Sequence, residues 1–325
     1  MQDKFPPFTI TSLILKKCQQ IAHELGVLEG AKINYAPIKL RKENQIKTIQ
    51  SSLAIEGNSL TTEQITALLE GKRIVGPKKD ILEVNNAIKV YSNLEKLAPL
   101  SISSFKQAHK ILMNNIIQNN GQWRQKGVGI FKGQKITHVA PPASMVDHLI
   151  TRLFKFLNNN ALNIPWIIKG SVFHYELEFI HPFSDGNGRM GRLWQQLIFM
   201  KENPIFQYIS VETIIKKNQA KYYDVLAKCD KTGDSTDFIG FSLEQTLIAL
   251  KEYGRLSSLK PMDVNMRLQH AKEVLQHKLF SRKNYLELYR NISSATASRD
   301  LEKGVKLNII TKTGKQNLTR YSFRR

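Results

Sequence analysis

The chain has 325 residues and carries 48 Lys or Arg against 27 Asp or Glu, which gives a formal net charge of +21. This length can bury one sizeable core with a small second domain, and the basic surplus, spread over the whole chain, favours a polyanionic partner without proving one. Two cysteines make no disulfide framework, no metal-ligand spacing is evident, and no leader or membrane-spanning run is recognisable. We therefore expect a cytoplasmic protein with no membrane partner.

The N-terminal region, residues 1–97, is expected to be helical. Apolar spacing predicts a helix at 43–56, and Gly57 follows it where a C-cap glycine belongs. Glu56 then lies in the last turn, where a carboxylate opposes the helix dipole by roughly 0.3–1 kcal/mol. The position calls either for a solvated surface or for a compensating cation.

A mainly α core interrupted by one β-hairpin is expected at residues 98–253. Helix-like spacing occurs at 62–70 and 79–97 in the N-terminal region, and it recurs in the core at 101–117, 143–159, 165–179, 188–201, 216–229 and 236–252. Residues 121–146 instead alternate short β-prone runs with glycines and contain Pro141 and Pro142, which predicts a hairpin followed by a new helix.

The segment from His181 to Arg192, HPFSDGNGRMGR, carries the chemistry of a nucleotide-phosphate site. His181 suits general-base work, and Asp185 offers hard oxygen ligands to magnesium. Backbone N–H groups can approach oxygen atoms closely at the next three residues, Gly186, Asn187 and Gly188. Helical spacing follows, so these residues lie at a helix N-terminus, which favours phosphate. Arg189 and Arg192 share one face of the first turn and can reach two phosphates.

The C-terminal part reads as a separate domain. A polar linker at 254–263 leads into residues 264–325, with helical runs at 265–279 and 282–290 and a third helix that Ser294 would cap and that would end near Lys303 and Gly304. Strands at 308–312 and 317–323 would flank a turn at Gly314, which completes the order of a winged helix. The residues that would face a nucleic acid are Thr296, Ser298 and Arg299 on the helix and Lys312, Lys315, Arg320, Arg324 and Arg325 on the wing. Duplex DNA fits this order, and protein binding or packing within a homodimer are the alternatives.

The twelve-residue segment resembles the signature of Fic-domain proteins at every fixed position, from the histidine, proline and phenylalanine through GNGR to the last arginine. The resemblance implies transfer of AMP from ATP to a hydroxyl side chain of a target protein, with magnesium as cofactor and pyrophosphate as leaving group. His181 would deprotonate the hydroxyl, Asp185 would hold magnesium between the phosphates, and Asn187 with its neighbouring amides would hold the α-phosphate. Arg189 and Arg192 would neutralise the β- and γ-phosphates, and Phe183 would anchor the loop in the core.

A second motif, Ser52, three residues, Glu56 and Gly57, resembles the inhibitory motif of Fic proteins that precedes the catalytic domain. In this family the glutamate pairs with the last arginine of the signature, which is Arg192 here. The resemblance implies a competition between a carboxylate and the γ-phosphate for one guanidinium.

Two more segments resemble family elements around the nucleotide. The hairpin looks like the flap that lines the cleft and pairs with an extended target segment, with contacts expected from Ile136, Thr137, His138 and Val139. The run KYYDVLAKCD looks like the helix that borders the adenosine, with Tyr223 stacking and Tyr222 beside it, although tyrosines at helical spacing also serve as plain core. Asp230 stands where relatives carry asparagine, which puts that contact in doubt.

Two functions from different classes fit these observations. One is a self-restrained adenylyltransferase, and the other is a DNA-binding regulator whose Fic fold only senses a nucleotide. The presence of His181 favours the enzyme, because nucleotide binding alone needs no base. Another nucleotide donor, or removal of AMP, would use much of the same phosphate cradle.

Overall fold

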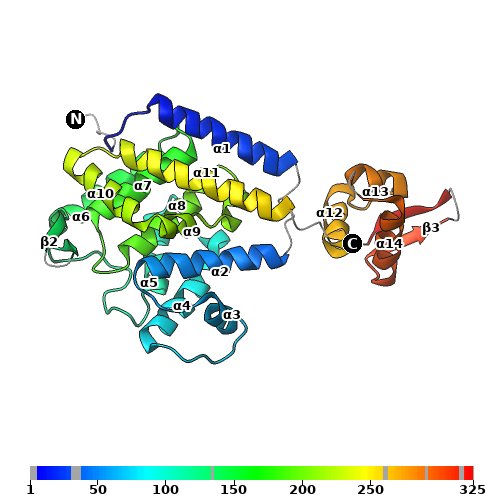
Figure 1. The fold of residues 1–325 in the computed structure, drawn as a ribbon, viewed down its shortest axis with the longest axis horizontal. Helices are drawn as coiled ribbons and strands as arrows, with labels where there is room; N and C mark the ends of the chain where they lie inside the picture. The colour runs from blue at the N-terminus through cyan, green and yellow to red at the C-terminus, as the bar shows by residue number, and fades with distance from the viewer. Residues whose placement is uncertain are drawn as a thin grey trace. The chain divides into compact units, whose positions relative to one another are not determined.

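The computed structural model describes residues 6–30, 38–132, 135–258, 263–289, 292–314 and 318–324, and the side chains of 38–39, 129–132, 135–138 and 257–258 lie outside this description. The chain divides into two compact units, one made of residues 1–31 and 41–254 and the other of residues 32–40 and 255–325 (Figure 1). The predicted fold class, mainly α with a β-hairpin and a small C-terminal α+β part, is confirmed. No helix within the described ranges combines the length and apolar character that crossing a membrane requires.

The first unit is a bundle of helices with one hairpin (Figure 1). The helices that lie wholly or mainly in this unit are α1 Ser12–Gly30, α2 Ile38–Ile55, α3 Thr62–Leu69, α4 Lys78–Tyr91, α5 Ile102–Leu112, α6 Val146–Asn158, α7 Trp166–Ile180, α8 Asn187–Phe199, α9 Val211–Lys217, α10 Gln219–Thr232 and α11 Thr236–Ser258. The strands β1 Gly129–Lys132 and β2 Lys135–Val139 pair antiparallel with a register shift between Ile130 and Phe131.

The antiparallel pair α7 and α8 forms the centre of this unit. Both helices are buried on almost every face, as expected for core helices rather than surface ones. Glycines let the two backbones approach, because a Cβ at Gly170 would lie 2.8 Å from the Phe199 ring and one at Gly191 would lie 2.8 Å from the His174 ring. The loop between the two helices carries His181 to Gly186, so the packing of α7 on α8 fixes the ends of the candidate site.

Several predicted helix boundaries were wrong. The helix predicted at 79–97 ends at Tyr91, and the one predicted at 101–117 ends at Leu112. The helix predicted at 216–229 is two helices that meet at Asn218, whose side chain donates to the Ile214 carbonyl oxygen and to Gln245. Such side-chain bonding competes with the backbone ladder, and helical periodicity does not reveal it.

The second unit contains α12 Val264–Leu275, α13 Arg282–Leu288 and α14 Ser294–Lys306, followed by the antiparallel strands β3 Ile310–Thr313 and β4 Arg320–Phe323. Its own apolar core is formed by Leu268, Ala271, Phe280, Tyr285, Tyr289, Ala297, Leu301, Ile310 and Phe323.

Several details of the second unit differ from prediction. The first helix stops at Leu275, short of the predicted 279. Ser293, not Ser294, caps α14 by accepting a hydrogen bond from the N–H of Thr296. The helix also continues past Gly304 to Lys306. Gly304 therefore does not end the helix, and its missing Cβ instead makes room for Ile310.

Candidate active site

His181 lies at the left-handed end of α7. Its backbone has φ 50° and ψ 58°, its N–H donates to the Leu177 carbonyl oxygen at 2.9 Å, and its side chain is half-buried. A non-glycine residue in this conformation is strained by about 1–3 kcal/mol and persists where its surroundings hold it. Since the chain turns sharply here, the imidazole stands at the junction of α7 with the loop that leads to α8.

The side chain of Arg124 holds that junction. It is 3% exposed and donates from Nε to the His181 carbonyl oxygen at 2.7 Å. The rest of the guanidinium donates to three more carbonyl oxygens, those of Lys126, Pro141 and Ile180. Burial lowers the pKa of Arg124. One buried cation therefore ties the end of α7 to both ends of the hairpin segment, a role that no local sequence pattern reveals.

We expect replacement of Arg124 to destabilise the first unit. A buried acceptor left without a donor costs about 1–3 kcal/mol, so Arg124→Met, which removes every donor, is expected to lower the free energy of unfolding by roughly 3–5 kcal/mol. Arg124→Lys keeps the charge but not the forked donors, so a smaller loss is expected. Urea unfolding of the three proteins measures this, and losses below about 0.5 kcal/mol in both variants would show that the four contacts contribute little.

The N-terminus of α8 is built for close approach. Gly186 has φ 86°, and a Cβ there would lie 2.7 Å from Met113 Sδ. Asn187 is 2% exposed, and its side chain exchanges hydrogen bonds of 2.9 Å with the backbone N–H and carbonyl oxygen of Phe183. Phe183 itself is fully buried, as predicted. The amide of Asn187 thus fastens the loop, while the first backbone N–H groups of α8 remain oriented for an anion.

His109 of α5 contacts the same loop. Its ring stacks on Phe183 with centroids 3.5 Å apart. Nδ1 accepts a hydrogen bond from the N–H of Gly121 at 2.8 Å, so Nε2 carries the proton and donates to the Asp185 carbonyl oxygen at 2.9 Å. Burial lowers the pKa of His109 to about 4, which keeps the ring neutral. Sequence reasoning missed this residue, because a histidine within an apolar helix stripe reads as ordinary core.

Asp185 has the properties of a magnesium ligand. Its side chain is 46% exposed, and Oδ1 accepts hydrogen bonds from the N–H of Gly186 at 2.6 Å and from Arg189 at 3.1 Å. No cluster of three or more His, Cys, Asp or Glu side chains occurs among the residues that the structure describes. A single carboxylate fits magnesium, which keeps several waters and completes its octahedron with substrate phosphates.

Arg189 is engaged with α4. Its side chain is 5% exposed and donates to Glu83 Oε1 at 3.0 Å. The other oxygen of Glu83 accepts from Asn58 at 2.8 Å, so the segment that follows α2 is connected through Glu83 and Arg189 to Asp185. The predicted contact of Arg189 with a phosphate would therefore have to share this guanidinium with two carboxylates.

Arg192 is held by the end of α2. Arg192 is 3% exposed, and its Nη2 donates to Glu56 Oε1 at 2.6 Å and to the Ser52 carbonyl oxygen at 2.9 Å, while Nε donates to Ser52 Oγ at 3.2 Å. Burial alone would lower the pKa of Arg192. The combined effect of Glu56, Tyr222 and Glu178 raises this pKa by more than burial lowers it, so the pKa lies above its usual value. Gly57, with φ 91°, then turns the chain away.

The Glu56 carboxylate also occupies space beside α8. An ideal Cβ on Gly188 would collide with Glu56 Oε1, so the carboxylate lies directly over the backbone of this glycine. It takes up room that an anion at the helix N-terminus would need. In this structure the negative Glu56 carboxylate therefore faces the positive end of the α8 dipole and the Arg192 guanidinium.

The tyrosines of α10 differ in environment. Tyr222 is buried, and its hydroxyl is 3.0 Å from His174 Nε2, which makes it part of the core. Tyr223 is 41% exposed, and its hydroxyl donates to the Ile55 carbonyl oxygen at 3.5 Å, one residue before Glu56. Asp230 accepts a hydrogen bond from the Tyr175 hydroxyl at 3.2 Å. Of the three, Tyr223 is the one that combines an exposed side chain with a contact at the end of α2.

The hairpin residues named from the sequence are only partly described. Val139 ends β2 and is 72% exposed, whereas the side chains of Ile136, Thr137 and His138 lie outside the described part. Their backbone forms the strand β2, with His138 opposite Ile130 and Val139 opposite Gly129.

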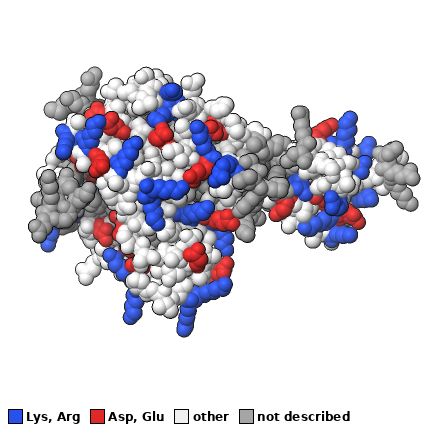
Figure 2. All heavy atoms as spheres, in the orientation of Figure 1, with Lys and Arg blue, Asp and Glu red and all other residues white. Residues whose placement is uncertain are grey.

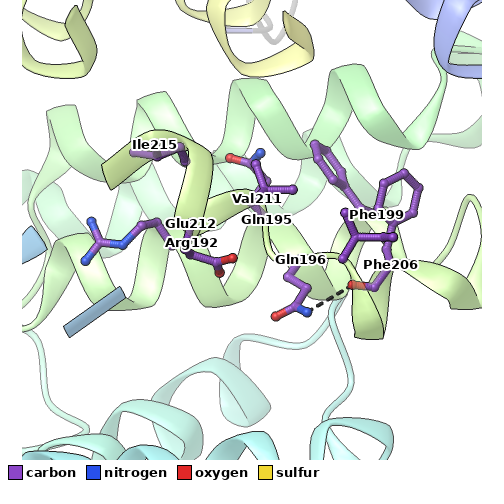
Figure 3. Close-up of a pocket in the computed structure, with 9 residues that line it drawn as sticks. Arg192, Gln195, Gln196, Phe199, Phe206, Val211, Glu212 and Ile215 are labelled. Carbon is purple, nitrogen blue, oxygen red and sulfur yellow. Dashed lines mark hydrogen bonds between the residues drawn. The ribbon is translucent and has the colours of Figure 1, made fainter. Parts of the chain in front are cut away.

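A small cavity lies behind Arg192 (Figure 3). Its lining is formed by Arg192, Gln195, Gln196, Phe199, Phe206, Ile209, Val211, Glu212 and Ile215. Gln196 donates to the Phe206 carbonyl oxygen at 3.0 Å, but its buried Oε1 has no hydrogen-bond partner among the residues that the structure describes. Burial raises the pKa of Glu212, which is 2% exposed, to about 7. The space suits about one water molecule and cannot hold a nucleotide.

The shifted pKa values of His109 and Glu212 predict that the contributions of these two residues to stability change with pH in opposite directions. A histidine with a lowered pKa loses its contribution as pH falls from about 6.5 to about 4, because only the unfolded state takes up the proton. A glutamate with a raised pKa loses its contribution as pH rises from about 4.5 to about 7, because only the unfolded state releases the proton. Across each of these pH ranges, the contribution of the residue to the free energy of unfolding changes by roughly 3 kcal/mol.

We therefore expect His109→Gln to make the free energy of unfolding fall more steeply with rising pH than in the wild type, and Glu212→Gln to make it rise more steeply. Chemical unfolding at intervals between pH 4 and pH 7.5 measures both slopes, and the difference between each variant and the wild type isolates one group. A variant whose slope equals that of the wild type would show that its residue does not titrate in this way.

The fold and the loop define a class of helical protein with a histidine one loop away from a glycine-containing helix N-terminus. A family model described as the Fic/DOC family matches residues 99–199. A Fic family protein from Desulfovibrio desulfuricans G20 is 35% identical, with a TM-score of 0.74 over 99% of this chain and 98% of that one. The chain belongs to the Fic family.

More distant relatives include named enzymes. The protein adenylyltransferase Fic of Drosophila erecta is 26% identical over 279 residues, which are 81% of this chain and 54% of that protein. That of Drosophila melanogaster is 27% identical over 250 residues, 74% of this chain and 48% of that protein. The chain thus spans about half the length of these curated relatives. Fic-1 of C. elegans, at 21% identity and a TM-score of 0.60 over 76% of this chain and 73% of that one, shares the fold.

Proposed function

We propose that this protein is an adenylyltransferase that transfers AMP from ATP to a hydroxyl side chain of a target protein and that Glu56 restrains it. The contact of Glu56 with both Arg192 and the Gly188 backbone carries the proposal, because a carboxylate in an anion site marks where a phosphate would go. The named adenylyltransferases among the relatives support the choice of reaction.

The residues divide the reaction between them. His181 accepts the proton of the target hydroxyl, whose oxygen attacks the α-phosphorus of ATP; the bond to the β-phosphate breaks and pyrophosphate leaves. The N–H groups at the start of α8 hold the phosphates, and Arg192 neutralises charge once Glu56 has moved. Asp185 would hold the magnesium ion, which supplies further neutralisation of the phosphates.

The donor is tested by incubating Glu56→Gly with ATP, UTP, GTP or CDP-choline and magnesium, followed by intact-mass spectrometry of the protein itself. The proposal expects a mass increase equal to one AMP, with ATP as the preferred donor. A different added group would replace ATP as donor. If the protein removed AMP from an already modified protein and transferred none, the reaction would run in the opposite direction to the one proposed. If no donor gave a modified product, the result would favour a nucleotide sensor.

A further inference from the structure

The second unit carries a disproportionate share of the positive charge. Residues 255–325 contain 16 Lys or Arg and 5 Asp or Glu, so this part alone contributes +11 of the net +21. Figure 2 shows Lys and Arg over the visible face of the unit. The proposed transfer of AMP uses none of these residues, so the charge calls for a separate explanation.

The exposed face of α14 has the shape that a groove of duplex DNA admits. Ala297, Asp300 and Leu301 of this helix are buried. The first turn of the helix exposes the small side chains of Ser294 and Ala295, so the helix backbone can come close to a partner there. Arg299, exposed one turn later, is the first long side chain on this face. A helix with small residues and one arginine near its N-terminus suits the major groove, where arginine pairs with guanine.

Neighbouring elements add cations around this face. Arg282 at the start of α13 donates to Ser298 of α14 at 2.9 Å, which places a second guanidinium beside Arg299. The hairpin contributes exposed Lys312 and Arg320. The acid on the same face, Glu302, lies 3.5 Å from Lys306 and belongs to the second half of the helix, away from the N-terminal residues that read bases.

A buried ion pair fixes the orientation of α14. Asp300 accepts two hydrogen bonds from Arg267 of α12, at 2.6 and 2.8 Å, and one from the Tyr285 hydroxyl at 3.3 Å. Because Asp300 adjoins Arg299 in the sequence, its anchoring turns Arg299 outward. The surface is therefore preorganised rather than merely basic.

We infer that the second unit is a duplex DNA-binding site in which the first half of α14 enters the major groove and Arg282, Lys312 and Arg320 contact phosphates. Lys315 and Arg325, expected from the sequence to take part, lie outside the described residues. Protein grooves that accept a helix bind its apolar face, whereas the exposed side of α14 presents small residues and Arg299, which favours DNA.

The test uses the full chain and fluorescence anisotropy with a labelled mixed-sequence duplex of about 24 base pairs, titrated at several salt concentrations. With the three proposed phosphate contacts, the plot of log affinity against log salt is expected to have a slope of about −2.7. Lys312→Glu with Arg320→Glu is expected to flatten the slope by about two contacts. The matched control is Lys155→Glu with Lys251→Glu, which changes the net charge equally at exposed sites of the first unit and is expected to leave the slope unchanged.

Base reading by Arg299 is tested by selection from a random duplex pool. Wild type is expected to enrich a guanine-containing site, and Arg299→Ala is expected to lose roughly 5- to 150-fold discrimination at one position while keeping the salt slope. Absence of binding at 50 mM salt, equal effects of the two charge reversals, or equal binding of duplex RNA, whose major groove is too narrow for a helix, would each overturn the inference. None of these readouts depends on transfer of AMP.

Discussion

Glu56→Gly is expected to modify itself with ATP and magnesium at least about tenfold faster than the wild type. A charge-assisted hydrogen bond to a guanidinium contributes about 1.5–3 kcal/mol, which corresponds to roughly 10- to 150-fold in the fraction of molecules whose Arg192 is free for a phosphate. The variant also clears the space over Gly188, where Glu56 Oε1 now lies. The rate of incorporation of labelled AMP measures the effect.

Two further variants separate charge from contact. Glu56→Gln keeps the size of the side chain and its ability to accept a hydrogen bond but does not repel phosphate, so an intermediate rate is expected. Ser52→Ala removes only the acceptor of Arg192 Nε at 3.2 Å and is expected to have a small effect. ATP should also raise the melting temperature of Glu56→Gly more than that of the wild type, because binding no longer displaces a carboxylate. Equal, measurable transfer rates for Glu56→Gly and the wild type would remove the proposed restraint.

The parts of the site that are local in sequence could be predicted from the sequence. Gly186, Gly188 and the helix that starts at Asn187 follow from short-range rules for chain turns and helix ends. The burial of Phe183 likewise followed from its apolar side chain within a polar loop. Glu56 was different, because by composition alone it reads as a surface acid, and only the resemblance of the motif around it linked it to Arg192, 136 residues away.

The residues that hold the site together could not be predicted. Arg124, His109 and Glu83 each act through contacts with carbonyl oxygens or side chains that are distant in the sequence. Their neighbours give no signal, since a buried arginine before a hairpin looks like any surface arginine until the carbonyl groups around it are known. The predicted helix ends were wrong for a related reason. Side-chain hydrogen bonds such as those of Asn218 decide where a helix stops, and the periodic pattern does not show them.

Removal of the base is expected to have the other large effect. In the Glu56→Gly background, His181→Ala should bind ATP as before and transfer AMP about 10²–10⁴ times more slowly, because proton removal from the target hydroxyl contributes a factor of that size. Asp185→Ala should instead weaken the magnesium-dependent part of ATP binding, since its half-exposed carboxylate is the proposed oxygen ligand of magnesium. Titration of ATP with and without magnesium, alongside transfer rates, distinguishes the two losses.

The backbone of His181 makes a second substitution necessary. Its φ of 50° is unfavourable for alanine, so His181→Ala alone could lose activity through a displaced loop. Asparagine tolerates this conformation better than most residues, and His181→Asn therefore removes the base while keeping the helix end that Arg124 holds. We expect His181→Asn to unfold at nearly the wild-type temperature and to transfer as little AMP as His181→Ala. Substantial transfer by His181→Asn would assign the proton to another acceptor and leave His181 a structural role at the end of α7.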